Sequence, residues 1–284
     1  MRNASRSLLV LVLSMLCATT LTIMPAGATF PGHDGKFVYR TNNDDIWTVS
    51  RAGENPARIV QNAEGAEYPA FSPSGDTVFF DANLDGDYDI VSVSQSGGPI
   101  RKITRNDSVD WGADPGLGGR ITYVCGRGGY DQICTIKADG SSRKRLTDTT
   151  SDDQYPEWSP NMQKIVFASD RGGNFDLFIM DADGSHEHRL TNGPDNESQP
   201  DFSPNGHKIV YTVDRASLWV VGASGKNPHK ILDVSNDTPT WSPSGDRIAF
   251  AEGDDIVTVL PDGSGRVNVT TGGSAGDNID WQTK

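Results

Sequence analysis

Short apolar runs recur along the chain from about residue 36 onward, and glycine, aspartate and proline separate them. Residues 164–168 and 176–180 are typical, because both runs are rich in the β-branched and aromatic residues that favour strands. The glycine and aspartate residues between the runs suit tight turns. Beyond residue 28, no window has the 3.6-residue period of an amphipathic helix. The pattern therefore predicts an all-β protein.

One unit of this pattern occurs six times. Each copy ends its first strand on an aromatic anchor, and the anchors are Phe71, Trp111, Trp158, Phe202, Trp241 and Trp281. They lie 39 to 47 residues apart, and a Ser-Pro turn follows the anchor in four copies. A repeat of about forty residues made only of strands and turns is typical of a β-propeller. The sequence predicts six antiparallel blades of four strands each.

The two ends of the chain are expected to build one blade together. Only three residues follow Trp281, so the last copy supplies a first strand alone. Residues 36–39 have the pattern of a second strand, and residues 45–47 that of a third. Pairing of the C-terminal strand with residues 37–39 would close the ring and remove the open sheet edges that promote aggregation.

Residues 1–28 are expected to be a signal peptide. Two arginines precede an apolar run, and Ala-Gly-Ala at residues 26–28 fits a signal peptidase site. Serine and threonine interrupt the apolar run, which makes it weak as a membrane span. We therefore expect an exported protein, periplasmic or secreted, without a transmembrane segment. Residues 29–284 are expected to form a single propeller domain.

The charge of the chain narrows the choice of partner. The formal net charge is −13 at pH 7, whereas nucleic acids and anionic lipid headgroups need a basic footprint. Cationic or neutral partners are favoured instead. We expect a monomer that binds a protein partner and no nucleic acid.

The residue before each anchor forms a second pattern. These residues are Ala70, Asp110, Glu157, Asp201, Thr240 and Asp280. The first strand of a propeller blade lies innermost, so the four acids should approach the central channel. They could form an acidic channel mouth for a cation or for a basic peptide segment. Local hydrogen bonding between neighbouring blades is the alternative interpretation.

One acidic loop has the spacing of a calcium site. The oxygen-bearing residues alternate along the loop: Asp81, Asn83, Asp85, Asp87 and Asp89. Gly86 stands at the sixth position, as in a calcium loop, but the twelfth position holds Ser92 instead of glutamate. An ordinary acidic loop between the second and third strands of the blade explains the same residues. Apart from calcium, no cofactor is expected.

Two cysteines follow the expected signal peptide. Cys125 and Cys134 fall diagonally across two neighbouring strands, where Cα atoms are typically about 7–8 Å apart. A disulfide prefers about 5.5–6 Å, although export would permit one. The sequence is compatible both with a disulfide between Cys125 and Cys134 and with two buried free thiols.

No catalytic set is recognisable in the sequence. Residues 272–276 fit Gly-x-Ser-x-Gly, but that motif requires a strand before it and a helix after it. The five histidines are scattered, and only His186 and His188 are close together, in an expected turn. We therefore expect a binding protein and not an enzyme.

The repeat resembles that of the TolB-type propeller family. The matching features are Ser159-Pro160, the loop at residues 170–173, the turn at 183–184 and Leu190-Thr191. The resemblance implies a propeller that docks another protein, as the family's propeller docks a peptidoglycan-associated lipoprotein of the cell envelope. The α/β domain that precedes the propeller in that family is expected to be absent. The alternative function is a carbohydrate-binding or carbohydrate-active propeller of the lyase or hydrolase type.

Overall fold

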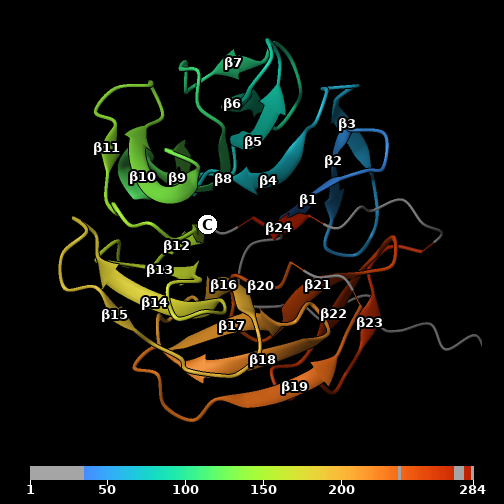
Figure 1. The fold of residues 1–284 in the computed structure, drawn as a ribbon. Helices are drawn as coiled ribbons and strands as arrows, with labels where there is room; N and C mark the ends of the chain where they lie inside the picture. The colour runs from blue at the N-terminus through green and yellow to red at the C-terminus, as the bar shows by residue number, and fades with distance from the viewer. Residues whose placement is uncertain (1–34, 236–237, 272–277, 283–284) are drawn as a thin grey trace, which may run out of the picture. The chain divides into compact units, whose positions relative to one another are not determined.

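The computed structural model describes residues 35–235, 238–271 and 278–282. These residues form six antiparallel sheets of four strands each, arranged as blades around a central channel (Figure 1). The only helical segment in the described ranges is the short 3-10 turn η1 (Leu117–Gly119). The prediction of an all-β, six-bladed propeller is confirmed.

Five blades are continuous in sequence, and their strands run outward from the channel in chain order. Blade 1 comprises β4 (Glu67–Phe71), β5 (Thr77–Asn83), β6 (Tyr88–Ser94) and β7 (Arg101–Lys102). Blade 2 comprises β8 (Asp110–Pro115), β9 (Arg120–Arg127), β10 (Tyr130–Lys137) and β11 (Lys144–Arg145). Blade 3 comprises β12 (Asp153–Trp158), β13 (Lys164–Ser169), β14 (Asp176–Asp181) and β15 (His188–Arg189). Blade 4 comprises β16 (Glu197–Phe202), β17 (Lys208–Val213), β18 (Ser217–Gly222) and β19 (His229–Asp233). Blade 5 comprises β20 (Thr240–Trp241), β21 (Ile248–Glu252), β22 (Asp255–Val259) and β23 (Val267–Asn268).

Blade 6 joins the two ends of the described chain. Its strands are β24 (Ile279–Trp281), β1 (Lys36–Arg40), β2 (Ile46–Ser50) and β3 (Ala57–Val60), in that order from the channel. Trp281 pairs with Phe37 and Ile279 pairs with Tyr39, so the predicted closure is confirmed in register as well as in topology. Figure 1 shows β24, in red, beside β1, in blue.

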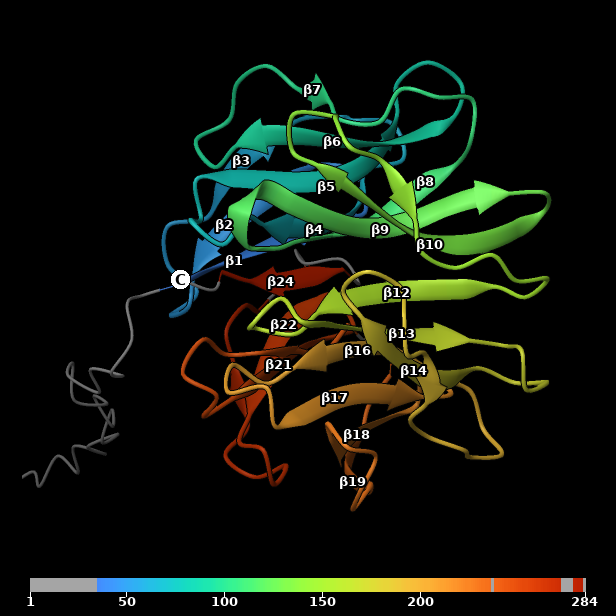
Figure 2. The ribbon, with the colours of Figure 1, turned by 90° about the vertical axis from the view of Figure 1, so that its left-hand side faces the viewer.

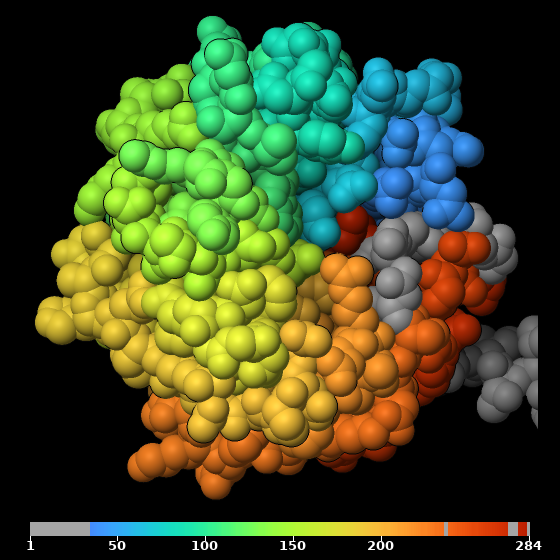
Figure 3. Space-filling view, viewed as in Figure 1, coloured from blue at the N-terminus to red at the C-terminus, as the bar shows by residue number. Residues whose placement is uncertain are grey.

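Apolar side chains are buried between blades. Six core clusters are present among the described residues, and each lies at an interface between two neighbouring blades. At the closing interface, for example, Phe37 and Trp281 of blade 6 share a cluster with Ala249 and Ile256 of blade 5. Figure 3 shows neighbouring blades in close contact around the ring. Each sheet therefore buries its faces against its neighbours, which makes the ring one folding unit.

The Ser-Pro turns have a structural explanation. The hydroxyl Oγ of Ser159 accepts a hydrogen bond from the backbone N–H of Lys164 at 2.9 Å, and Ser203 bonds to Lys208 in the same way. These bonds close the turn between the first and second strands. We call the end of the ring that carries these turns the turn face, and the opposite end the loop face. Figure 2 shows the strands from the side as they run between these two ends.

Cys125 and Cys134 form a disulfide across the twisted β9–β10 hairpin. Cys125 pairs with Gln132 and Cys134 pairs with Tyr123, so the two cysteines are diagonal, as the sequence indicated. Their Cα atoms are nevertheless only 5.9 Å apart, and the structure joins them in a disulfide. The twist of a hairpin shortens the Cα–Cα distance along one of its two diagonals. The distance expected for a flat sheet is therefore too long for this pair.

Two sequence predictions concern residues that the structure does not describe. The expected signal peptide at residues 1–28 and the Gly-x-Ser-x-Gly motif at 272–276 both lie outside the described residues. Within the described ranges, no helix has the length and apolar character needed to cross a membrane.

Candidate binding channel

Each blade contributes three consecutive residues of its innermost segment to a chamber on the channel axis. The chamber has a volume of about 110 Å³. Its outermost layer, the rim, lies toward the loop face and consists of Tyr68, Gly112, Tyr155, Gln199, Thr238 and Asn278. A middle layer consists of Pro69, Ala113, Pro156, Pro200, Pro239 and Ile279. The innermost layer, the belt, consists of Ala70, Asp114, Glu157, Asp201, Thr240 and Asp280.

A β-bulge in the first strand creates the rim. The pairing register shifts between Gln154 and Glu157 in blade 3, and blades 1, 2 and 4 shift at the equivalent place. The rim residues Tyr68, Tyr155 and Gln199 have φ values of 46°, 53° and 51°. A left-handed backbone is unfavourable for bulky residues and is concentrated at functional sites. The bulge therefore changes the direction of the first strand in these blades just where it lines the axis.

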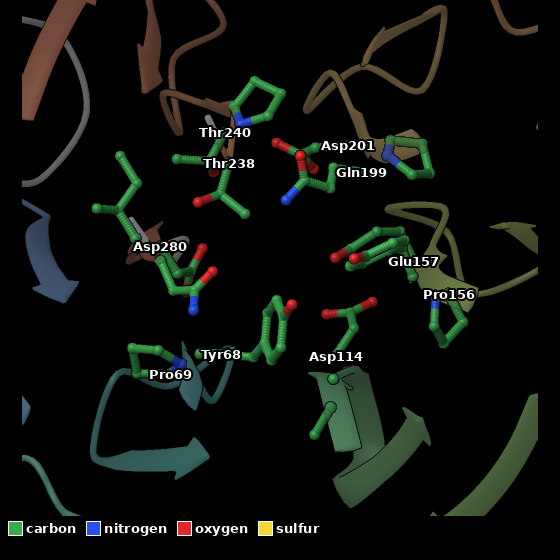
Figure 4. Close-up of a pocket in the computed structure, with 18 residues that line it drawn as sticks. Tyr68, Pro69, Asp114, Pro156, Glu157, Gln199, Asp201, Thr238, Thr240 and Asp280 are labelled. Atoms are coloured by element: carbon green, nitrogen blue, oxygen red, sulfur yellow. The ribbon is translucent and has the colours of Figure 1, made fainter. Parts of the chain in front are cut away.

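The belt is an acidic ring (Figure 4). The carboxylates of Asp114, Glu157, Asp201 and Asp280 surround one opening. Three of them, from alternate blades, also accept a hydrogen bond from the backbone N–H of the next blade's anchor. Asp114 accepts from Trp158 at 2.6 Å, Asp201 from Trp241 at 2.6 Å, and Asp280 from Phe71 at 2.8 Å. Both sequence interpretations thus hold in part, since these carboxyls link neighbouring blades and also face the channel.

The structure corrects one of the four expected channel acids. Glu157, Asp201 and Asp280 meet in the belt, but Asp110 does not line it. The Asp110 side chain is buried inside blade 2, where it accepts hydrogen bonds from Asn106 at 2.6 Å and Arg143 at 3.3 Å. Asp114 holds the belt position instead.

The cause is a misplaced anchor in blade 2. Pro115 pairs with Ile121 just as Trp158 pairs with Ile165, so Pro115 and not Trp111 occupies the anchor position. Trp111 instead packs against the rim, with ring centroids 5.3 Å from Tyr68 and 5.1 Å from Tyr155. An anchor at residue 115 narrows the repeat spacing to between 39 and 44 residues, which is the signal that could have located Asp114.

Burial raises the pKa of every acid in the belt. The pKa of Asp114 rises from 3.8 to about 7 and that of Asp280 to about 6, against the lowering effect of their backbone hydrogen bonds. For Asp201, burial and then the charges of Asp280 and Asp114 hold the pKa well above its usual range. The pKa of Glu157 is also well above its usual range, because of burial and then the neighbouring charge of Asp114.

On the turn face, the belt forms the floor of an apolar funnel of about 400 Å³. Its wall includes five prolines, one from each of blades 1 to 5: Pro73, Pro115, Pro160, Pro204 and Pro243. Trp158, Trp241, Leu117 and Met162 complete the apolar lining. The belt therefore separates a small chamber from a larger funnel, and its acids line both.

Comparison with known proteins agrees with this architecture. Residues 153–276 match the family model PD40, the TolB beta propeller domain. These residues therefore carry the TolB-type propeller repeat. TolB from Acinetobacter baumannii superposes with a TM-score of 0.77 at 19% identity, over 88% of this chain and 66% of that chain. A structure from Agrobacterium tumefaciens provisionally named TolB gives a TM-score of 0.70 at 20% identity, over 88% of this chain and 97% of its own.

A sequence relative extends the comparison. An uncharacterized protein of Agrobacterium fabrum is 28% identical over 157 residues, which cover 54% of this chain and 51% of the relative. The TolB-type chain thus spans about half the length of this relative and about two thirds of the Acinetobacter TolB. At 19 and 20% identity, the structural likenesses show the fold.

The expected calcium loop is rearranged. Ligand atoms of Asp85, Asp87 and Asp89 lie within 4.8 Å of one another, but Asp81 does not join them. Asp81 is buried in β5 and accepts a hydrogen bond from the backbone N–H of Gly112 in blade 2. Asn83 accepts one from the backbone N–H of Gly86 at 2.9 Å. The alternating spacing therefore does not produce five convergent ligands.

A lysine from the outer strand enters the remaining cluster. The ammonium of Lys102 lies 2.7 Å from one carboxylate oxygen of Asp85 and also pairs with Asp89. The other oxygen of Asp89 accepts a hydrogen bond from Thr104 at 2.8 Å. Lys102 thus offsets one of the three negative charges of the cluster and pairs with two of its carboxylates.

We therefore expect calcium to leave the melting temperature of the wild-type protein unchanged, because the Lys102 ammonium competes for the carboxylates. In Lys102→Met, calcium should raise the melting temperature by mass action on the freed cluster. Lys144→Met, the same change on the outer strand of blade 2, serves as the control. A rise of several degrees in calcium for the wild-type protein would show that an ion displaces the lysine.

Proposed function

We propose that this chain is an exported TolB-type propeller that binds another protein, with a role in the cell envelope. In this proposal the partner docks on the turn face, and a basic segment of the partner reaches the belt. The observation that carries the proposal is the acidic belt at the floor of the apolar funnel. An apolar wall with a few convergent polar groups is the usual form of a binding pocket.

The chemistry of the funnel favours a peptide segment with a cationic tip. Prolines and tryptophans present a rigid apolar wall that loses little conformational entropy on binding. The belt acids are held at raised pKa by burial, and a cation among them would favour their ionised forms. Binding should therefore weaken as salt rises and as the pH falls through the pKa range of the belt.

The carbohydrate-active alternative has less support. Oligogalacturonate lyase in complex with manganese shares the propeller architecture, with a TM-score of 0.57 at 11% identity. Among the described histidines, His186, His188, His207 and His229 are all exposed. None of these four lines the chamber or the funnel. We therefore favour protein docking over sugar chemistry.

A pair of matched surface variants tests the docking face. Leu117 is 57% exposed on the funnel wall, and Val109 is 47% exposed just before β8 at the opposite end of blade 2. Leu117→Asp should reduce partner capture from a cell-envelope extract by at least about tenfold, as expected when a charge enters an apolar contact. Val109→Asp should capture as well as the wild-type protein. Loss of capture in Val109→Asp with full capture in Leu117→Asp would place docking on the loop face and contradict the proposal.

A further inference from the structure

Two residues with side-chain amides, Gln199 and Asn278, line the rim of the chamber. Gln199 is 8% exposed, and its oxygen accepts from the hydroxyl of Thr212 at 3.4 Å. Figure 4 shows the Gln199 side chain directed into the chamber, and no described residue accepts a hydrogen bond from its Nε2. Asn278 is 7% exposed and lines the same chamber, and its side-chain amide has no hydrogen bond within the described ranges. An amide that lines a chamber and makes few hydrogen bonds within the protein is suited to a polar ligand.

Aromatic rings flank the same rim. Tyr68, Trp111 and Tyr155 form a cluster with ring centroids 5.1 to 6.0 Å apart. Tyr68 and Tyr155 hold a left-handed backbone, so the fold keeps two large rings at the rim despite strain. The faces of such rings attract cations.

The opposite wall of the chamber is the belt. Its carboxylates converge from blades 2, 3, 4 and 6 on one axis. Asp114, Asp201 and Asp280 each commit an oxygen to a backbone N–H. A calcium ion requires six to eight oxygen ligands, which this set does not provide, whereas an ammonium group needs only a few acceptors.

We propose that the chamber binds a small primary amine that carries a second polar group. Its ammonium would donate hydrogen bonds to the belt carboxylates, and its polar end would meet the amides of Gln199 and Asn278. The volume of about 110 Å³ limits such a ligand to a few heavy atoms. The chamber and the funnel share the belt carboxylates, so the amine and a basic partner segment would compete for them, whereas the rim amides belong to the chamber alone.

Three probes separate the elements of this proposal: 3-aminopropanol, propylamine and the trimethylated analogue of 3-aminopropanol, all measured by calorimetry at constant ionic strength and neutral pH. The wild-type protein should bind 3-aminopropanol at least about tenfold more tightly than the trimethylated analogue, which has no N–H donor. It should also prefer 3-aminopropanol to propylamine by about fivefold, since only the former satisfies an amide. Gln199→Leu should remove that second preference and leave capture of the docking partner unchanged.

A charge-matched pair tests the belt. Glu157→Gln should weaken 3-aminopropanol binding by about tenfold, whereas Glu64→Gln, the same change at an exposed position, should have no effect. The thermal shift given by 3-aminopropanol checks both variants independently of calorimetry. Equal affinity for the trimethylated analogue, equal effects of the two substitutions, or no binding of any amine would each overturn the proposal.

Discussion

Deletion of residues 277–284 is expected to remove most of the stability of the ring. The deletion removes β24, the innermost strand of blade 6, and leaves the edge of β1 unpaired at Phe37–Tyr39. It also removes Trp281, which is 4% exposed and packs on Phe37 with ring centroids 4.4 Å apart. Loss of a large buried aromatic alone costs about 3–5 kcal/mol, and a whole domain is stable by only about 5–15 kcal/mol. In thermal unfolding, the truncated protein should have a much lower melting temperature and a broader transition than the intact protein.

A point variant isolates the contribution of the aromatic ring. Trp281→Ala should lower the free energy of unfolding by about 3–5 kcal/mol, whereas Val267→Ala, on the exposed outer strand of blade 5, should change it by less than about 1 kcal/mol. If the truncated protein melts within a few degrees of the intact one, blade closure does not stabilise the ring.

Acidification from pH 8 to pH 5 is expected to stabilise the protein. The folded state raises the pKa of Asp114 from 3.8 to about 7 and that of Asp280 to about 6. The folded state therefore binds more protons than the unfolded state at intermediate pH, and stability falls as the pH rises from about 4 through these two values. Each group contributes on the order of 3 kcal/mol to this difference, at about 1.4 kcal/mol per pKa unit. Chemical denaturation at a series of pH values measures the slope.

The variant Asp114→Asn tests the origin of that slope. Asparagine keeps the shape and an acceptor for the Trp158 N–H but cannot ionise, so the stability of this variant should depend less on pH and exceed that of the wild-type protein at pH 8. Asp262→Asn, on an exposed turn, should keep the wild-type slope. Stability of the wild-type protein that rises from pH 5 to pH 8 would contradict the assignment of raised pKa values.

The sequence was sufficient to predict the architecture because a propeller repeats its signals. Strand, turn and anchor recur at nearly constant spacing, so blade number and the pairing of Trp281 with Phe37 followed from the pattern. The same logic located Glu157, Asp201 and Asp280, because the residue before a true anchor occupies the same place in each blade.

The sequence analysis misplaced a residue where it relied on residue type and not on strand pairing. Trp111 matches the other anchors in residue type, yet the bulge after it moves the anchor position to Pro115. Residue type alone could not reveal that shift, whereas the more even repeat spacing of an anchor at residue 115 indicates it. The acidic loop of blade 1 likewise differs from the five-ligand set that its spacing suggested, since Lys102 reaches Asp85 and Asp89 from the outer strand.

The chamber itself was beyond prediction. The left-handed backbone at Tyr68, Tyr155 and Gln199 depends on the bulges of strands packed in a ring, and no local motif marks it. The position of Gln199 and Asn278 on one rim likewise becomes visible only when the six blades are assembled into a ring. Sequence periodicity can assign residues to the channel, but it cannot show which of their polar atoms remain available to a ligand.

Titration of the belt carboxyls by carbon NMR tests the central claim most directly, namely that a ring of half-buried acids on the channel axis binds a cation. In the free protein, Asp114 should titrate with a pKa of about 7 and Asp280 with a pKa of about 6. Addition of 3-aminopropanol, or of a basic partner segment, should lower these values because a bound cation favours the ionised carboxylates. Ordinary pKa values near 4 for both residues, unchanged by either addition, would contradict the account.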